Sequence, residues 1–193
     1  MNWHADYSKT WDHPHRNVIV EAFRQFRFGS VCEVGCASGP NLVRLFKEWP
    51  RLEIGGVDVS ESAIACAREI FPKGIFDVRP MDDLFFSDSS VDMVLSDMAA
   101  IYVSPLRIGA AVKEIGRIAR KGVVLCEFYH PSRWRRIALW LATGYFAHDW
   151  PKILEQNDFY DITIRKLKEE EWPGGYPQSI YGYVFSAKTL KTV

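Results

Sequence analysis

The amino-acid sequence predicts an α/β protein with a mostly parallel sheet between two layers of helices. Through residue 128, short apolar segments that are typical of buried strands alternate with segments of helical periodicity. Near the C-terminus, two strand-like segments follow each other without a helix between them, and strands joined in this way pair antiparallel. The chain has 193 residues, which is enough for one domain with a sizeable core.

The first elements establish the alternation of helices and strands. Residues 16–28 carry apolar side chains at helical spacing. A buried strand at 30–34 leads through a glycine turn into a helix at about 40–49, where Pro40 suits the first helical turn. A second strand follows at 53–57.

The next elements repeat this pattern. The helix expected at 61–71 has Ser60 as its N-cap and stops at Pro72. It is followed by a weaker strand at 75–79 and a strongly apolar one at 91–96. A helix at 105–119 and a strand at 123–128 complete the parallel part of the sheet.

The C-terminal part departs from this alternation. We expect an amphipathic helix at about 132–147 and a short second helix capped by Asp149. An alternating strand at 159–167 is separated by a Pro- and Gly-rich turn from a last strand at 180–187.

The composition excludes several classes of protein. Lys plus Arg and Asp plus Glu both total 24, so no net charge draws the chain to nucleic acid or to an anionic membrane. No apolar run is long enough to span a bilayer, and the first residues lack the features of a signal peptide. The four cysteines stand in apolar settings typical of free thiols, and neither they nor the histidines have metal-ligand spacing. We therefore expect a cytoplasmic protein without a metal site, either a monomer or a homodimer.

The turn after the first strand is the main clue to a ligand. Strand, glycine turn and helix form a ligand crevice at the carboxyl edge of an α/β sheet. A dinucleotide fingerprint would need glycines where Ala37 and Pro40 stand, so that ligand does not fit. The chain instead has an acidic residue followed by two spaced glycines: Glu33, Gly35 and Gly39.

Together with later segments, this pattern resembles the class I S-adenosylmethionine-dependent methyltransferases, including those of the methyltransferase type 11-like domain. The resemblance covers roughly residues 28–130 and rests on the order and spacing of four motifs. They are the glycine turn at 33–39, the acidic Asp58 after the second strand, the segment 81–96 and the segment 112–125. It implies a Rossmann-like, seven-stranded sheet in the order 3-2-1-4-5-7-6 with an antiparallel last strand, and S-adenosylmethionine as methyl donor, released as S-adenosylhomocysteine.

The resemblance also implies a set of cofactor-binding residues. Asp58 would accept the ribose hydroxyls, and Glu33 would take the ammonium of the amino-acid tail. For the adenine side, either the carboxylate of Asp82 or only the backbone of Met81 would bind, because Arg79-Pro80 replaces the family's common Gly-Asp. The cofactor-binding residues expected in full are Glu33, Gly35, Cys36, Ala37, Gly39, Asp58, Val59, Met81, Asp82 and Ser96.

Candidates for the acceptor side lie where the fourth and fifth strands end. Asp97, Tyr102 and His130 are the catalytic candidates, and Glu127 is a further acidic group there. A base is needed only if the acceptor must lose a proton, and a histidine titrates near neutrality. Each of these side chains has an equally reasonable structural role.

Substrate or lid residues are expected from two further segments. In the N-terminal arm, Tyr7 and Trp11 are spaced to share a helix face and either contact the ligands or pack in the core. The inserted helix, with Tyr129, Arg133 and Trp134 near its start, could serve as a lid, a dimer face, a membrane-surface helix or a core helix.

The sequence thus predicts one methyltransferase domain over 1–193. Its parts are an N-terminal arm and helix (1–28), a cofactor-binding core (29–130), an inserted helix (131–148) and a last helix with the antiparallel pair (149–193). The expected reaction is in-line methyl transfer to oxygen or nitrogen of a small molecule. An RNA or protein methyltransferase and a non-catalytic module that binds a nucleoside or a partner protein are the alternatives, because fold does not fix the acceptor.

Overall fold

The computed structural model describes residues 12–190. The predicted ligand contacts Tyr7 and Trp11 therefore lie outside the described residues. Seven strands form one sheet in the order β3-β2-β1-β4-β5-β7-β6, which confirms the predicted fold class. The strands are β1 (Ser30–Val34), β2 (Glu53–Asp58), β3 (Ile75–Val78), β4 (Val91–Asp97), β5 (Ala119–Phe128), β6 (Phe159–Lys166) and β7 (Gly182–Thr189).

The first five strands run parallel. A helix returns the chain to the same edge of the sheet after β1, β2 and β4, and the loop 79–90 does so after β3. In the centre, Val31 of β1 is paired with Ile54 of β2 on one side and with Met93 of β4 on the other. All but the ends of β1 and β4 are buried, as their continuous apolar runs predict for a parallel sheet covered on both faces.

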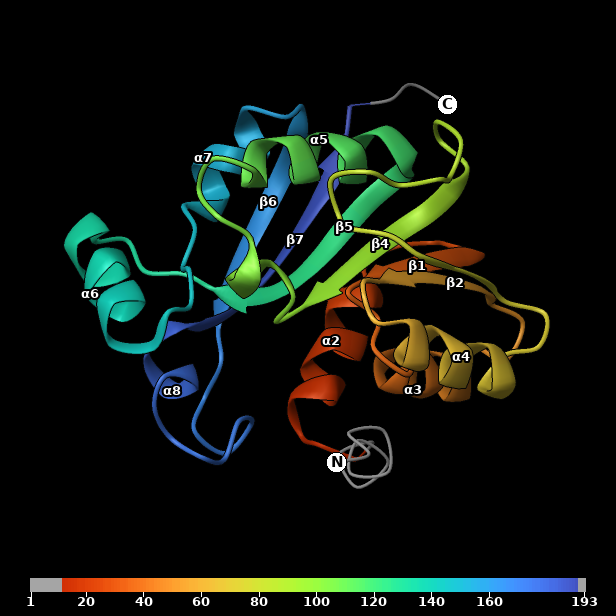
Figure 1. Ribbon diagram of the computed structural model, residues 1–193, viewed down its shortest axis with the longest axis horizontal. Coiled ribbons are helices and arrows are strands. Elements are labelled where there is room, and N and C mark those ends of the chain that lie inside the picture. Colours follow the sequence, from red (N-terminus) through yellow and green to blue (C-terminus); the bar gives the residue numbers. More distant parts are fainter. Residues whose placement is uncertain (1–11, 191–193) are drawn as a thin grey trace.

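Helices cover the two faces of the sheet (Figure 1). One layer contains α2 (His15–Phe23), α3 (Pro40–Glu48) and α4 (Glu61–Ile70), and the other contains α5 (Ile108–Ile118) and α7 (Trp150–Glu155). Each layer has its own apolar core: Phe23 and Leu45 belong to the first, and Ile115 and Trp150 to the second. The sheet separates these two cores, as in a three-layer sandwich.

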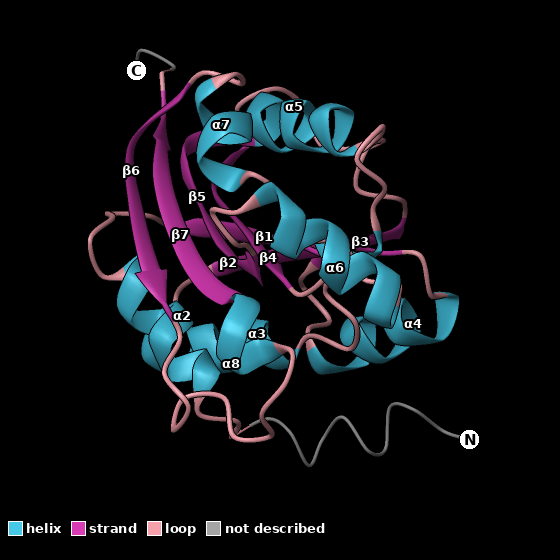
Figure 2. Cartoon of the chain, turned by 90° about the vertical axis from the view of Figure 1, so that its left-hand side faces the viewer, coloured by secondary structure: helices cyan, strands magenta, loops and turns pink. Residues whose placement is uncertain are grey.

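The antiparallel end of the sheet is formed as predicted. β7 lies between β5 and β6 and pairs antiparallel with both; Phe185, for example, faces Leu125 of β5. The last strand begins at Gly182 rather than at residue 180, because Gln178–Tyr181 forms the short helix α8. The long β6–β7 connection with α8 lies beside α2 and reaches the edge of the sheet where the site is found (Figure 2).

The inserted helix α6 (Arg133–Thr143) stands apart from both helical layers (Figure 1). Leu139 is its buried residue, whereas Trp134 is 78% and Leu141 72% exposed. A core helix is therefore the wrong interpretation of this segment. Within residues 12–190, no helix is both long and apolar enough to span a bilayer.

Candidate active site

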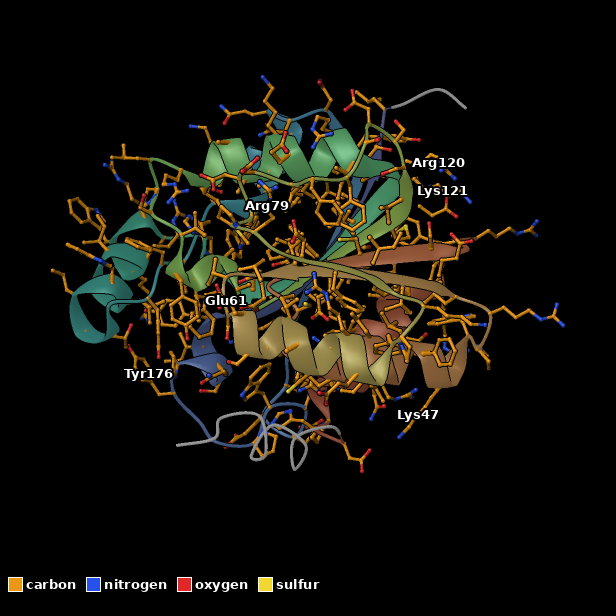
Figure 3. The ribbon with its side chains drawn as sticks, turned by 45° about the vertical axis from the view of Figure 1, so that its right-hand side comes forward. Lys47, Glu61, Arg79, Arg120, Lys121 and Tyr176 are labelled. Carbon is orange, nitrogen blue, oxygen red and sulfur yellow. The ribbon has the colours of Figure 1, made fainter. Side chains whose placement is uncertain are left out.

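A cavity of 1310 Å³ lies at the carboxyl edge of the parallel strands. Figure 3 shows Glu61, which begins α4 on this side, and Arg120 and Lys121 at the opposite end of the sheet. That basic pair is held by Asp92 and is remote from the cavity. Ten of the residues predicted for the site line the cavity: Glu33, Gly35, Cys36, Ala37, Asp58, Val59, Met81, Asp82, Asp97 and Tyr102.

The loop after β1 has three residues with positive φ: Gly35 at 78°, Ala37 at 47° and Gly39 at 84°. A Cβ on Gly35 would lie 2.2 Å from the Cβ of Ala99, so the loop after β4 already fills the space that a side chain would need. Gly39 precedes α3 and lies outside the cavity lining. Both glycines are therefore explained by the backbone conformation of the loop. The sequence had suggested instead that they let a ligand approach the main chain closely.

Asp58 fixes this loop to the end of β2. Its Oδ2 accepts the main-chain N–H of Ala37 and its Oδ1 that of Ser60, both at 2.9 Å. Each carboxylate oxygen can accept a further bond, so the side chain can also take ribose hydroxyls. Beside it, Val59 is 73% exposed and offers an apolar surface to the cavity.

The segment after β3 brings Met81 and Asp82 to the cavity. Met81 is 9% exposed and packs in the core. Asp82 accepts two hydrogen bonds from Arg107, at 2.8 Å from Nε and 2.6 Å from Nη2. No local pattern predicts this pair, because Arg107 lies 25 positions further along the chain.

A buried polar cluster forms the floor of the cavity. Asn41 Nδ2 donates to Glu33 Oε1 at 2.6 Å and to Asp97 Oδ2 at 2.9 Å. His15 Nε2 lies 2.8 Å from the same Asp97 oxygen, and Arg16 Nη1 lies 3.7 Å from it and donates to Asn41 Oδ1. His15, Arg16 and Asn41 were not predicted as site residues, and only their position at two helix starts could have suggested it.

Two oxygens of this cluster have no hydrogen-bond partner within residues 12–190: Glu33 Oε2 and Asp97 Oδ1. Burial raises the pKa of Glu33 well above its usual range, and Asp97 adds to the effect. Burial acts in the same direction on Asp97, but His15 and Arg16 outweigh it and hold the pKa of that carboxyl at about 2. A buried carboxylate with a spare acceptor favours a cationic, hydrogen-bond-donating ligand.

Glu127 and Ser96 lie behind the cavity rather than in it. Glu127 Oε1 accepts from Ser96 Oγ at 2.8 Å and from the N–H groups of Ala99 and Ala100 at 3.1 Å each. Burial raises the pKa of Glu127 to about 8. Ser96, predicted to bind the cofactor, and Glu127, predicted near the acceptor, thus support the loop after β4.

Four predicted acceptor-side residues are outside the cavity lining: Tyr129, His130, Arg133 and Trp134. His130 Nδ1 accepts the N–H of Ser132 at 3.0 Å, so this ring caps the turn before α6. Tyr129 packs edge-on against Tyr183. The structure therefore does not place these side chains for the roles that the sequence suggested. β5 reaches the cavity with its last residue, Phe128, and the residues after it contact Tyr183 and Ser132 instead.

Aromatic side chains line another part of the cavity, which is called the aromatic wall below. The rings of Tyr102 and Tyr145 meet edge-to-face with centroids 5.5 Å apart, and Phe128 also lines the cavity. On the side of α2, the rings of His13 and His15 lie 5.0 and 4.1 Å from the ring of Trp172, measured between centroids. These side chains give this part of the cavity an apolar surface.

Comparisons with known proteins agree with this geometry. Residues 31–122 match the family model described as a methyltransferase domain. A search of curated protein sequences finds no match.

Among solved structures, the chain is similar to an S-adenosylmethionine-dependent methyltransferase of Methanosarcina mazei, with 20% identity, a TM-score of 0.69, and 88% of this chain and 97% of that one covered. The geranyl diphosphate C-methyltransferase of Streptomyces coelicolor gives 14% identity, a TM-score of 0.71, and 90% and 76% coverage. The magnesium protoporphyrin IX methyltransferase of Synechocystis gives 16% identity and a TM-score of 0.65, with 98% of this chain and 85% of that one covered.

At these identities, the similarity to solved structures establishes only the fold. The match to the family model indicates a methyltransferase domain within it. The strand order is the one that the resemblance to class I methyltransferases implied, and the acidic Asp58 ends β2. Residues 31–122 therefore match a methyltransferase domain, and they lie within a fold that S-adenosylmethionine-dependent methyltransferases share.

Proposed function

We propose that the protein transfers the methyl group of S-adenosylmethionine to an oxygen or nitrogen atom of a small-molecule acceptor. The observation that carries the proposal is the pair of unpartnered buried oxygens, Glu33 Oε2 and Asp97 Oδ1, on the floor of a cavity that also holds Asp58. The α-ammonium of the donor can satisfy such acceptors, and Asp58 can take its ribose hydroxyls.

When bound, the donor supplies an electrophilic methyl group on sulfur. The protein's own contribution is to align the acceptor with that group and to exclude water. Met81 and Val59 would hold the adenine between apolar surfaces, and Asp82 is positioned for it by Arg107. Tyr102, which lines the cavity on the aromatic side, would contact the acceptor.

A small-molecule acceptor is supported by the aromatic wall of the cavity and by the zero net charge of the chain. Two of the similar structures are methyltransferases named for small molecules, geranyl diphosphate and magnesium protoporphyrin IX. The absence of a charge excess also speaks against docking to RNA, which relies on phosphate contacts. We further propose, from the composition, that the protein acts in the cytoplasm.

Donor binding can be tested by the thermal stability of the protein with S-adenosylmethionine and S-adenosylhomocysteine. Both should raise the melting temperature, because a ligand that binds only the folded state stabilises it. Glu33→Gln should weaken binding by about 10- to 100-fold, the value of a hydrogen bond to a charged group. The matched control is Asp88→Asn, an exposed carboxylate that pairs with Arg117 away from the cavity. If neither ligand shifts the melting temperature of the unchanged protein, the proposal fails.

The acceptor can be found by incubating a metabolite extract with the protein and isotope-labelled S-adenosylmethionine, followed by mass spectrometry. A labelled product methylated at oxygen or nitrogen is expected. Labelled RNA or protein in place of a small molecule would contradict the acceptor class, and donor binding without any labelled product would indicate a non-catalytic module.

A further inference from the structure

Three side chains form a continuous hydrogen-bonded line from the end of β4 to the cavity. Asp97 Oδ2 lies 2.8 Å from His15 Nε2, and His15 Nδ1 lies 2.5 Å from His13 Nδ1. His15 is 3% exposed, whereas His13 is half-buried and both rings line the cavity. The line connects a buried carboxylate to an imidazole that solvent and ligands can reach.

The chemistry of each atom determines where the protons lie. The carboxylate of Asp97 can only accept, so His15 carries its proton on Nε2. In the neutral ring of His15, Nδ1 then has a lone pair and accepts a hydrogen bond from the N–H at His13 Nδ1. A neutral imidazole carries only one proton, and in His13 that proton is on Nδ1, so Nε2 is unprotonated. Within residues 12–190, His13 Nε2 has no hydrogen-bond partner.

We propose that His13 is the general base of the reaction and that the acceptor is a hydroxyl compound with an apolar body, which must lose its proton as it is methylated. This proposal rests on the proposed methyltransferase function. His15 and Asp97 are positioning residues, because they act through His13 and fix its tautomer.

The proton transfers balance. The acceptor hydroxyl gives its proton to His13 Nε2 while its oxygen forms a bond to the methyl carbon, and the carbon–sulfur bond breaks with its electron pair passing to sulfur. His13 passes its Nδ1 proton to His15 Nδ1, so the positive charge ends on His15, 2.8 Å from the Asp97 carboxylate. After the product leaves, the proton returns along the line and is released to water.

The surroundings of His13 support this role. Burial lowers the pKa of His13 to about 4, so the ring is neutral at neutral pH and its Nε2 keeps a lone pair that can accept a proton. The ring of Trp172 packs beside both imidazoles, 5.0 Å from His13 and 4.1 Å from His15 between centroids. The aromatic wall around Tyr102 supplies the apolar contact for the body of the acceptor.

The tautomers can be observed by long-range ¹H–¹⁵N NMR of protein labelled with ¹⁵N-histidine, recorded with S-adenosylhomocysteine present. We expect His15 to be protonated at Nε2 and His13 at Nδ1. Asp97→Asn should change the tautomer ratio of His13, although these two side chains are joined only through His15. A His13 ring protonated at Nε2 in the unchanged protein would overturn the proposal, whether or not the protein transfers methyl groups.

The catalytic step is tested with the hydroxyl acceptor that the labelled-donor experiment identifies. His13→Gln should lower kcat by about 10²- to 10⁴-fold, the usual contribution of a general base, and leave the affinity for S-adenosylhomocysteine unchanged. An acceptor analogue whose hydroxyl is already ionised should largely escape this loss. The control is His130→Gln, which removes an imidazole outside the cavity lining and should keep the rate.

These results separate the two proposals. Loss of S-adenosylhomocysteine binding in His13→Gln would make His13 a cofactor contact and refute the base. A product methylated at an atom that carried no dissociable proton would refute it as well. If the unchanged protein binds the donor but methylates nothing, the proposed function fails, while the NMR result still decides on the proton line.

Discussion

The main-chain N–H of Ala37 donates a hydrogen bond to Oδ2 of Asp58 at 2.9 Å. This bond connects the glycine loop after β1 to the end of β2, so one carboxylate both shapes the loop and faces the cavity. Organisation of the loop and binding of the donor therefore depend on the same side chain.

Replacing Asp58 should affect both properties. Asp58→Ala removes the acceptor of two main-chain N–H groups and the expected ribose contacts, so S-adenosylhomocysteine affinity should fall by about 100-fold or more and stability by about 1–3 kcal/mol. Asp58→Asn retains one acceptor oxygen, so its affinity and its stability should lie between those of the unchanged protein and of Asp58→Ala. Calorimetric titration and thermal unfolding measure the two effects, and unchanged affinity in Asp58→Ala would disprove the ribose role.

The glycine loop offers a pair of opposite substitutions. Ala37 has a φ of 47°, a conformation that costs alanine about 1 kcal/mol, so Ala37→Gly should be neutral or slightly stabilising. Gly35→Ala should instead destabilise the protein by at least about 1–3 kcal/mol, because its Cβ would lie 2.2 Å from that of Ala99. Urea unfolding of both variants measures the difference, and equal stabilities would contradict the loop geometry.

Glu127 should make stability depend on pH. Burial raises its pKa from the usual 4.5 to about 8, so the folded protein holds a proton that the unfolded chain releases. This contribution is complete below about pH 4.5 and is lost as pH rises towards 8, by an upper bound of about 5 kcal/mol at 1.36 kcal/mol per pKa unit.

Glu127→Gln keeps an acceptor for Ser96, Ala99 and Ala100 but cannot ionise. Between pH 5 and 8 the unchanged protein should lose stability that the variant keeps. The free energy of unfolding of Glu127→Gln minus that of the unchanged protein should therefore rise with pH, as measured by urea unfolding at several pH values. Parallel pH profiles of the two proteins would show that Glu127 is not the titrating group.

The exposed face of α6 should contribute little to folding. Trp134→Ser and Leu141→Ser change side chains that are 78% and 72% exposed, and each should alter stability by no more than about 0.5 kcal/mol. Leu139→Ala, at a position with 0% exposure, should cost about 2–5 kcal/mol. Circular dichroism melting compares the three, and a large loss in the exposed variants would mean that this face is covered.

Some features of this protein were readable from the sequence alone. The alternation of strands and helices, the antiparallel last pair and the placing of Glu33, Gly35 and Asp58 at strand ends all followed from local patterns. Such features depend on neighbours along the chain, since periodicity and turn chemistry act over a few residues.

The tertiary structure decided which polar groups meet. His15 reaches Asp97 across 82 positions, and Asp82 is engaged by Arg107. It also turned His130 away from the cavity and left Trp134 exposed. No local pattern encodes these outcomes, because the parallel sheet brings the ends of distant strands and helices to a single edge, and pairing there is set by burial and geometry.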